Sequence, residues 1–187
     1  MINMLLRFKN IIILIITIIV LILLVVFALS KQNETPVEKY MKHNFKHVSY
    51  KTMKLIDITE YKDYRLELYV FNGNDTDIAA FLLKKDSKND FNVVENSSLV
   101  HNFESYRVFF HVDDVSNDLI SCIITDGKPR SVGISVLDKS KKFDLSKGKL
   151  GGYIFDIVDI FDLEKSVGNE VTYTFFDENK HKVNSTD

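Results

Sequence analysis

Two histidines near residue 45 have the spacing of a metal-binding pair. His43 and His47 lie four residues apart in HNFKH, so on a helix they project from one face. Two imidazoles one turn apart can chelate zinc, but a zinc site also needs a third ligand, and a metalloprotease motif would place a Glu beside His43. The sequence shows no such Glu and no third ligand that can be placed. We therefore expect a solvated helix face and assign no metal ligand.

Clustered acidic residues offer two further candidates. The loop NGNDTD at residues 72–77 could present oxygens to calcium, but it lacks the EF-hand order and the closing Glu, and turn chemistry explains its composition. Asp156, Asp159 and Asp162 would share one face of a helix, and paired carboxylates can perform acid–base chemistry. No second catalytic group lies near them in sequence, so we expect neither site.

His111 and Cys122 are the remaining candidates for catalysis. His111 with Asp113 or Asp114 stands at the end of an expected strand, where a hydrolase could carry its site, provided that the groups share a pocket. Cys122 is the only cysteine, so no intramolecular disulfide can form, and its surroundings, LISCIIT, predict a buried strand. The sequence thus predicts no catalytic, cofactor-binding or metal-binding residue, and no cofactor.

The longest apolar stretch, residues 11–29, must position whatever follows it. It carries no charge, Gly or Pro, and as a helix it would extend roughly 28 Å, about one bilayer core. Arg7 and Lys9 precede it without an acid, which favours a cytoplasmic N-terminus and an exported C-terminal part. A cleaved signal peptide is the alternative, although its apolar region is usually shorter. We expect an uncleaved, single-pass signal-anchor.

Past residue 30 the periodicity is mostly that of β-strands. Thr35, Pro36 and Glu38 are the exception, because they form a capping-box pattern with Pro at the first helical position and predict a helix over about 36–47. Residues 139–149 are expected to form a basic exposed hairpin. Residues 153–161 fit strand or helix, and their β-branched content favours a strand. The other predicted strands are 48–59, 65–71, 78–83, 91–95, 106–112, 119–125, 130–137, 171–176 and 181–183.

Charge narrows the classes of partner. The net charge is −2, and Arg7 and Lys9 are the only charged side chains before residue 31, so the remaining chain is more acidic still. This balance argues against a nucleic-acid partner. We expect the lipid bilayer to be contacted through residues 11–29, and the exported domain to meet an envelope protein or a surface ligand. The oligomeric state stays open.

Two segments carry a resemblance to known proteins. The strand–turn–strand segment IITDGKPRSVGISV (123–136) and the C-terminal hairpin TFFDENKHKV (174–183) resemble parts of uncharacterised single-pass membrane-anchored proteins of Gram-positive bacteria. In the final turn Lys180 stands where those proteins often have Gly. The resemblance implies export and a small β-rich domain, and it implies no activity.

Together these patterns predict one N-terminal transmembrane α-helix followed by a mainly antiparallel β (α+β) domain with a short juxtamembrane helix. The expected division is a cytoplasmic N-terminus (1–10), the anchor (11–29), a spacer (30–35) and an extracytoplasmic domain (36–187), in which 96–105 would be the meeting point of two halves. The expected function is that of a membrane-tethered binding or interaction domain: an accessory, sensor or protective protein of the cell envelope. The alternatives are a cell-surface hydrolase and a secreted effector released by cleavage.

Overall fold

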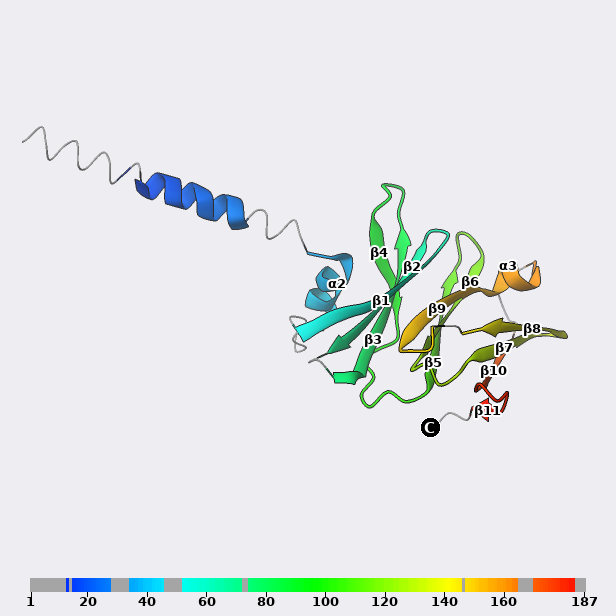
Figure 1. Ribbon diagram of the computed structural model, residues 1–187. Helices are drawn as coiled ribbons and strands as arrows, with labels where there is room; N and C mark the ends of the chain where they lie inside the picture. The colour runs from blue at the N-terminus through cyan, green and yellow to red at the C-terminus, as the bar shows by residue number, and fades with distance from the viewer. Residues whose placement is uncertain are drawn as a thin grey trace, which may run out of the picture.

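The computed structural model describes residues 13, 15–27, 34–45, 52–71, 74–145, 147–164 and 170–183, without the side chains of 74–76. As predicted, the chain forms a mostly antiparallel β domain with a few helices (Figure 1). Its elements are α2 (Pro36–Asn44), β1 (Met53–Tyr61), β2 (Tyr64–Phe71), β3 (Asn74–Lys85), β4 (Phe91–Asn96), β5 (Tyr106–Asp113), β6 (Asp118–Thr125), β7 (Ser131–Val136), β8 (Lys139–Asp144), β9 (Gly151–Asp156), α3 (Ile157–Phe161), β10 (Val171–Phe176) and β11 (Lys182–Val183).

The strands form three antiparallel sheets. Sheet A is a meander in the order β1-β2-β3-β4, sheet B has the order β5-β6-β9, and sheet C has the order β11-β10-β7-β8. The β7–β8 hairpin is inserted in the chain between β6 and β9, and its edge is extended by β10 and β11. The element that joins sheets A and B in sequence is the segment around 97–105, where Val100 forms a bridge with Ile78.

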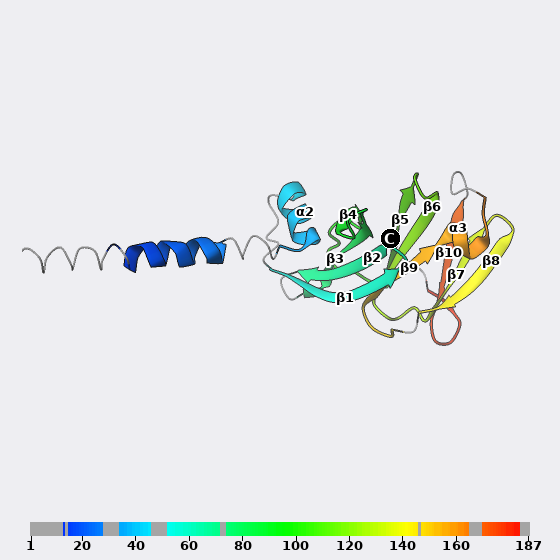
Figure 2. The same ribbon diagram turned by 90° about the horizontal axis from the view of Figure 1, so that it is seen from above.

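The sheets pack into layers through the apolar faces of their strands. Leu66 and Leu68 of β2 meet Cys122 and Ile124 of β6 in a core between sheets A and B, the A–B core. The opposite face of β6, with Ile123, packs on sheet C in the B–C core. Figure 2 shows the resulting order: α2, sheet A, sheet B and sheet C lie one after another. β6 is buried on both faces, as its mostly apolar sequence favours.

Helix α2 covers the outer face of sheet A. Thr35 caps the helix: its hydroxyl accepts from the Glu38 amide at 3.2 Å, and its own amide donates to the Glu38 carboxylate at 2.8 Å, which confirms the predicted capping box. Val37 and Met41, one turn apart, are buried against β2 and β3 in the helix–A core. The helix ends at Asn44, short of the predicted residue 47.

Polar side chains join sheets A and B where β1 runs beside β9. The Thr59 hydroxyl donates to the Gly152 carbonyl at 2.8 Å, and the Gly152 amide donates to the Asp57 carboxylate at 2.9 Å. The Lys147 ammonium binds both Asp57 and Thr59. Asp57 follows a register irregularity in β1, which turns its carboxylate toward the neighbouring sheet.

The predicted transmembrane helix over residues 11–29 has to be corrected. Among the described residues, no helix combines the length and apolar character that crossing a membrane requires. The single-pass, transmembrane and signal-anchor descriptions are corrected with it. The predicted sidedness, with an extracytoplasmic C-terminal part, stays a prediction.

Two local predictions also need correction. The predicted strand at 153–161 stops at Asp156, where α3 begins, because the Asp156 carboxylate caps the helix by accepting from the Asp159 amide at 3.2 Å. The basic segment from 139 forms no hairpin of its own, because β8 pairs in full with β7 around a two-residue turn at Leu137. The Lys139 ammonium then reaches the last carbonyl of α3 at 2.7 Å.

Candidate functional site

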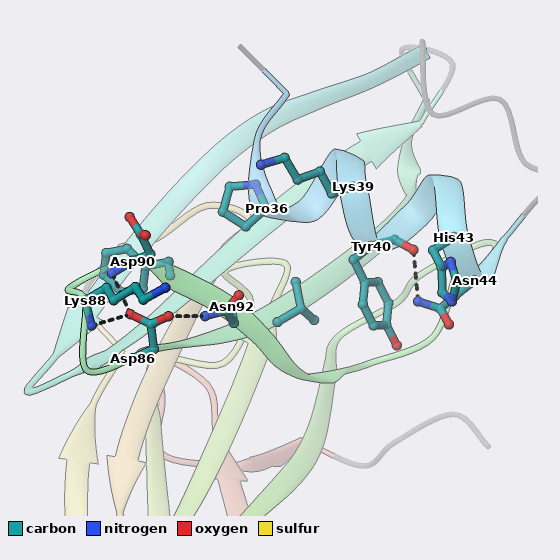
Figure 3. Close-up of a pocket in the computed structure, with 11 residues that line it drawn as sticks. Pro36, Lys39, Tyr40, His43, Asn44, Asp86, Lys88, Asp90 and Asn92 are labelled. Carbon is teal, nitrogen blue, oxygen red and sulfur yellow. Dashed lines mark hydrogen bonds between the residues drawn. The ribbon is translucent and has the colours of Figure 1, made fainter. Parts of the chain in front are cut away.

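A groove of about 680 Å³ separates α2 from the β3–β4 hairpin. Figure 3 shows its two walls, one from the side of α2 that faces β4 and the other from the β3–β4 turn and the start of β4. Its volume lies within the range of small-ligand pockets. Its lining residues are Pro36, Lys39, Tyr40, His43, Asn44, Asp86, Lys88, Asp90, Phe91, Asn92 and Val93.

The helical wall forms because one face of α2 packs on sheet A and a second face borders the groove. Val37 and Met41 fix the helix on sheet A, and this leaves Tyr40, His43 and Asn44 on the side toward β4. Tyr40 is held on both ends: its ring meets Phe81 edge-on at 6.0 Å, and its hydroxyl accepts from the Asn96 amide group at 2.9 Å. The wall is therefore preformed at its centre.

The opposite wall is a turn organised by Asp86. Its carboxylate accepts from the backbone amides of Lys88 and Asp90, at 2.8 and 3.0 Å, and from the Asn92 side chain at 3.3 Å (Figure 3). These hydrogen bonds, those from the amides of Asp90 and Lys88 first, lower the pKa of Asp86. The Asp86 charge is thus used to shape the turn and has little capacity left for a ligand.

Phe91 and Val93 supply the apolar part of the groove. Both belong to β4 and pack against the helix–A core. The Arg65 guanidinium lies 3.9 Å from the centre of the Phe91 ring, and Arg65 is itself paired with Glu60 at 2.6 Å. The stacked cation and its ion pair hold the ring in place beside the groove.

Two ammonium groups in the groove have no partner within the described part of the chain. These belong to Lys39, from the helix, and Lys88, from the turn, and Figure 3 shows them on opposite walls. The Asp90 carboxylate likewise has no partner among the residues that the structure describes. The groove therefore brings the rings of Tyr40 and Phe91 together with two cations from opposite walls, an arrangement suited to binding a ligand.

Other hollows on the described surface are less suited to a ligand. A cavity of about 620 Å³ lies at the end of the A–B core and is lined by Phe103, Leu150 and Lys149, with Asp126 and Lys128 at its rim. Those two rim charges pair with each other at 3.2 Å, so they offer less to a ligand than Lys39 and Lys88 do.

The cluster with the most enzyme-like composition lies around Asp113 at the β5–β6 turn. The Asp113 carboxylate binds the Lys84 ammonium and accepts from the Tyr64 hydroxyl at 2.9 Å, and Ser116 lies 3.3 Å from Lys84. A Ser–Lys pair needs a neutral lysine to activate the serine. Burial lowers the pKa of Lys84, but its bonds to Asp113 and Tyr64 outweigh burial and raise it, so the base is absent.

His111, the predicted partner of Asp113 or Asp114, does not complete a catalytic site. It lies on the same face of β5 as Asp113, and its ring meets Tyr64 edge-on at 6.2 Å. The Asp113 carboxylate accepts its hydrogen bond from the Tyr64 hydroxyl and not from His111. His111 also lines none of the four cavities found on the described surface. The condition for the hydrolase interpretation, a shared pocket, is not met in the described structure.

The other acidic candidates contribute to structure. Asp156 and Asp159 both bind Lys62, at 2.9 and 3.5 Å, and Asp159 also accepts from the Tyr61 hydroxyl at 2.8 Å. The Asp156 bond raises the pKa of Lys62, so a stable cation clamps the β1–β2 turn to α3. In the loop at 72–77, only the Asp77 side chain is described, and it binds His101 at 3.2 Å.

The histidine pair and the cysteine can now be placed. His43 lines the groove, while His47 lies outside the described residues. Cys122 is fully buried in the A–B core, as predicted, and burial raises the pKa of its thiol, which makes it inert. No group of three or more metal-ligating side chains occurs among the described residues.

Sequence reasoning missed the groove because its two walls are distant in the chain. The one local signal was the row Pro36, Tyr40 and His43 beside the apolar row of α2, at helical spacing. Nothing local links that row to the β3–β4 turn. Comparison of the chain with protein families, with curated proteins and with solved structures finds no match.

Proposed function

We propose that this chain is a binding domain without chemistry of its own, and that it takes its ligand in the groove between α2 and β4. The observation that carries the proposal is the pair of cations, Lys39 and Lys88, that have no partner among the described residues and line the same groove as the aromatic rings of Tyr40 and Phe91. A folded domain has little reason to hold such a combination for its own stability, since exposed charges contribute little to folding.

The clusters that could have supplied chemistry support the same proposal. The carboxylates of Asp113 and Asp156 are engaged by the ammonium groups of Lys84 and Lys62, and these contacts join separate elements of the fold. An accessory, sensor or protective role in the envelope remains within this proposal as a prediction, and the proposed groove is where such a role would be exercised.

The test is a ligand screen on the full chain labelled with ¹⁵N. We expect the backbone amide shifts caused by bound fragments to cluster at Tyr40, His43, Asn92 and Val93. His43→Trp should fill the groove and abolish these shifts, because His43 is exposed there and the larger ring can occupy the space.

Asn179→Trp is the matched control, because Asn179 is equally exposed but lines a different cavity. It should leave the fragment shifts intact. Shifts that cluster at another surface, or shifts at the groove that survive His43→Trp, would show that the groove is not the binding site. Chemical conversion of a bound compound would contradict the absence of catalysis.

A further inference from the structure

Strand β4 offers a backbone edge beside the groove. It is the last strand of sheet A and, in the described part of the chain, pairs only with β3. Such an edge presents amide and carbonyl groups that can accept a further strand. Natural edges are usually protected by charges, prolines or bulges. In β4 the register irregularity falls near Val94, so Phe91, Asn92 and Val93 form a regular, uncharged edge segment.

The regular segment is also the part of β4 that lines the groove. Phe91 and Val93 point toward the helix–A core and α2, with Asn92 between them. Side chains alternate in a strand, so every second side chain of a strand added at this edge would point to the same side as Phe91 and Val93. Those side chains would enter the space between α2 and the β3–β4 turn.

The charges of the groove select the chemistry of those side chains. Lys39 and Lys88 reach the groove from opposite walls, whereas Asp86 is already surrounded by three donors. Lys85 adds a third cation, 5.4 Å from the centre of the Phe91 ring. Against these stands the Asp90 carboxylate at the end of the turn, which has no partner in the described part of the chain. An acidic side chain between Lys39 and Lys88 is therefore favoured over a basic one.

We infer that the groove binds an extended peptide segment with acidic side chains, which adds to sheet A as a fifth strand along β4. This inference rests on the proposed function, because it names the ligand of the same groove. Backbone hydrogen bonds to β4 would supply general affinity, and the two lysines would supply the preference for acidic side chains.

The experiment uses short synthetic peptides, blocked at both ends, with the full chain. The probe alternates Val and Glu, and a second peptide alternates Val and Lys. A third has the probe sequence with alternate backbone amides methylated, which removes the donors of one strand edge. We expect the Glu peptide to bind roughly tenfold more tightly than the Lys peptide, the size that two exposed ion pairs can provide. The methylated peptide should not bind.

Two charge variants test the role of the lysines. Combined Lys39→Glu and Lys88→Glu changes should reverse the preference between the Glu and Lys peptides, because both side chains are exposed and their replacement leaves the fold intact. Lys54→Glu is the control: Lys54 is an exposed lysine on β1, at the opposite edge of sheet A, and its change should alter neither affinity.

The outcomes separate the inference from the proposed function. If fragments shift the groove amides but no peptide binds, the peptide inference is wrong and the groove proposal stands. If peptides bind but shift amides of β1, β5 or β8, strand addition at β4 is wrong. Equal affinity for the Glu and Lys peptides would remove the charge selection. Sedimentation of the full chain as a dimer that His43→Trp dissociates would assign the edge to a second copy of the chain.

Discussion

Single residues in this fold show how a polar group can be buried without becoming an active site. Asp113 is 8 % exposed, and four groups stabilise its carboxylate: the Lys84 ammonium, the Tyr64 hydroxyl and the amides of Val115 and Ser116. Burial alone would raise the pKa of Asp113, but Lys84 and these hydrogen bonds outweigh it and hold the pKa well below its usual range. The same contacts raise the stability of the fold.

Asp113→Asn should lower the free energy of unfolding by about 3 kcal/mol, because it leaves the partly buried Lys84 without its counter-ion. The native pKa is depressed, so the contribution of Asp113 is present above its unfolded pKa of about 4 and is lost as the pH falls toward the native pKa. Urea unfolding at several pH values measures both effects. The difference between the wild type and Asp113→Asn should be constant near neutral pH and shrink in acid.

Asp114→Asn is the control for this prediction, since Asp114 is the exposed neighbour of Asp113. It should change the free energy of unfolding by less than about 0.5 kcal/mol. A similar loss in both variants would mean that the charge of the turn as a whole, and not the Lys84–Asp113 contact, stabilises the fold.

At the scale of elements, the turn between β6 and β7 depends on one glycine. Gly127 has a φ of +90°, and a Cβ placed on it would lie 2.4 Å from the backbone nitrogen of Lys149. Its amide donates to the Thr125 hydroxyl at 2.8 Å. Both the backbone conformation and the close approach of Lys149 require that no side chain be present.

Gly127→Ala should therefore destabilise the fold by about 2 kcal/mol, measured by thermal or urea unfolding. Gly133→Ala in β7 is the matched control, because its Cβ would meet Phe176 at an ordinary 3.6 Å and its φ is not in the left-handed region. We expect Gly133→Ala to be neutral or slightly stabilising. Equal destabilisation by both changes would contradict the role given to the turn.

Elements with a strong local signal could be predicted, and those decided by distant contacts could not. Thr35 and Glu38 encode the start of α2 locally, and the alternation along β5 and β7 identifies those strands. By contrast, the change from β9 to α3 depends on Asp156 acting as a helix cap while Lys62, far away in sequence, neutralises it. The groove likewise arises only when α2 packs beside β4, so the sequence of either wall alone does not predict it.

At the scale of the whole molecule, β6 couples the layers. On one face, Cys122 and Ile124 belong to the A–B core; on the other, Ile123 belongs to the B–C core with Phe175 of sheet C. Phe175 is 1 % exposed, and its ring stacks on Tyr106 of sheet B at 3.6 Å. Loss of sheet C would thus expose one face of the strand that completes the other core, so sheets A, B and C should open together.

Cys122 allows this coupling to be measured, because it is the only thiol in the chain and is fully buried. Its reaction with a thiol reagent reports opening of the A–B core. Phe175→Ala should cost about 3 kcal/mol by leaving a cavity in the B–C core, and, if opening is cooperative, it should speed the labelling of Cys122 about a hundredfold. Val115→Ala, at a side chain that is 97 % exposed, should leave the labelling rate unchanged. If Phe175→Ala lowers the melting temperature of the protein but leaves the Cys122 labelling rate unchanged, sheet C opens separately. Loss of packing in the B–C core would then not reach the A–B core through β6.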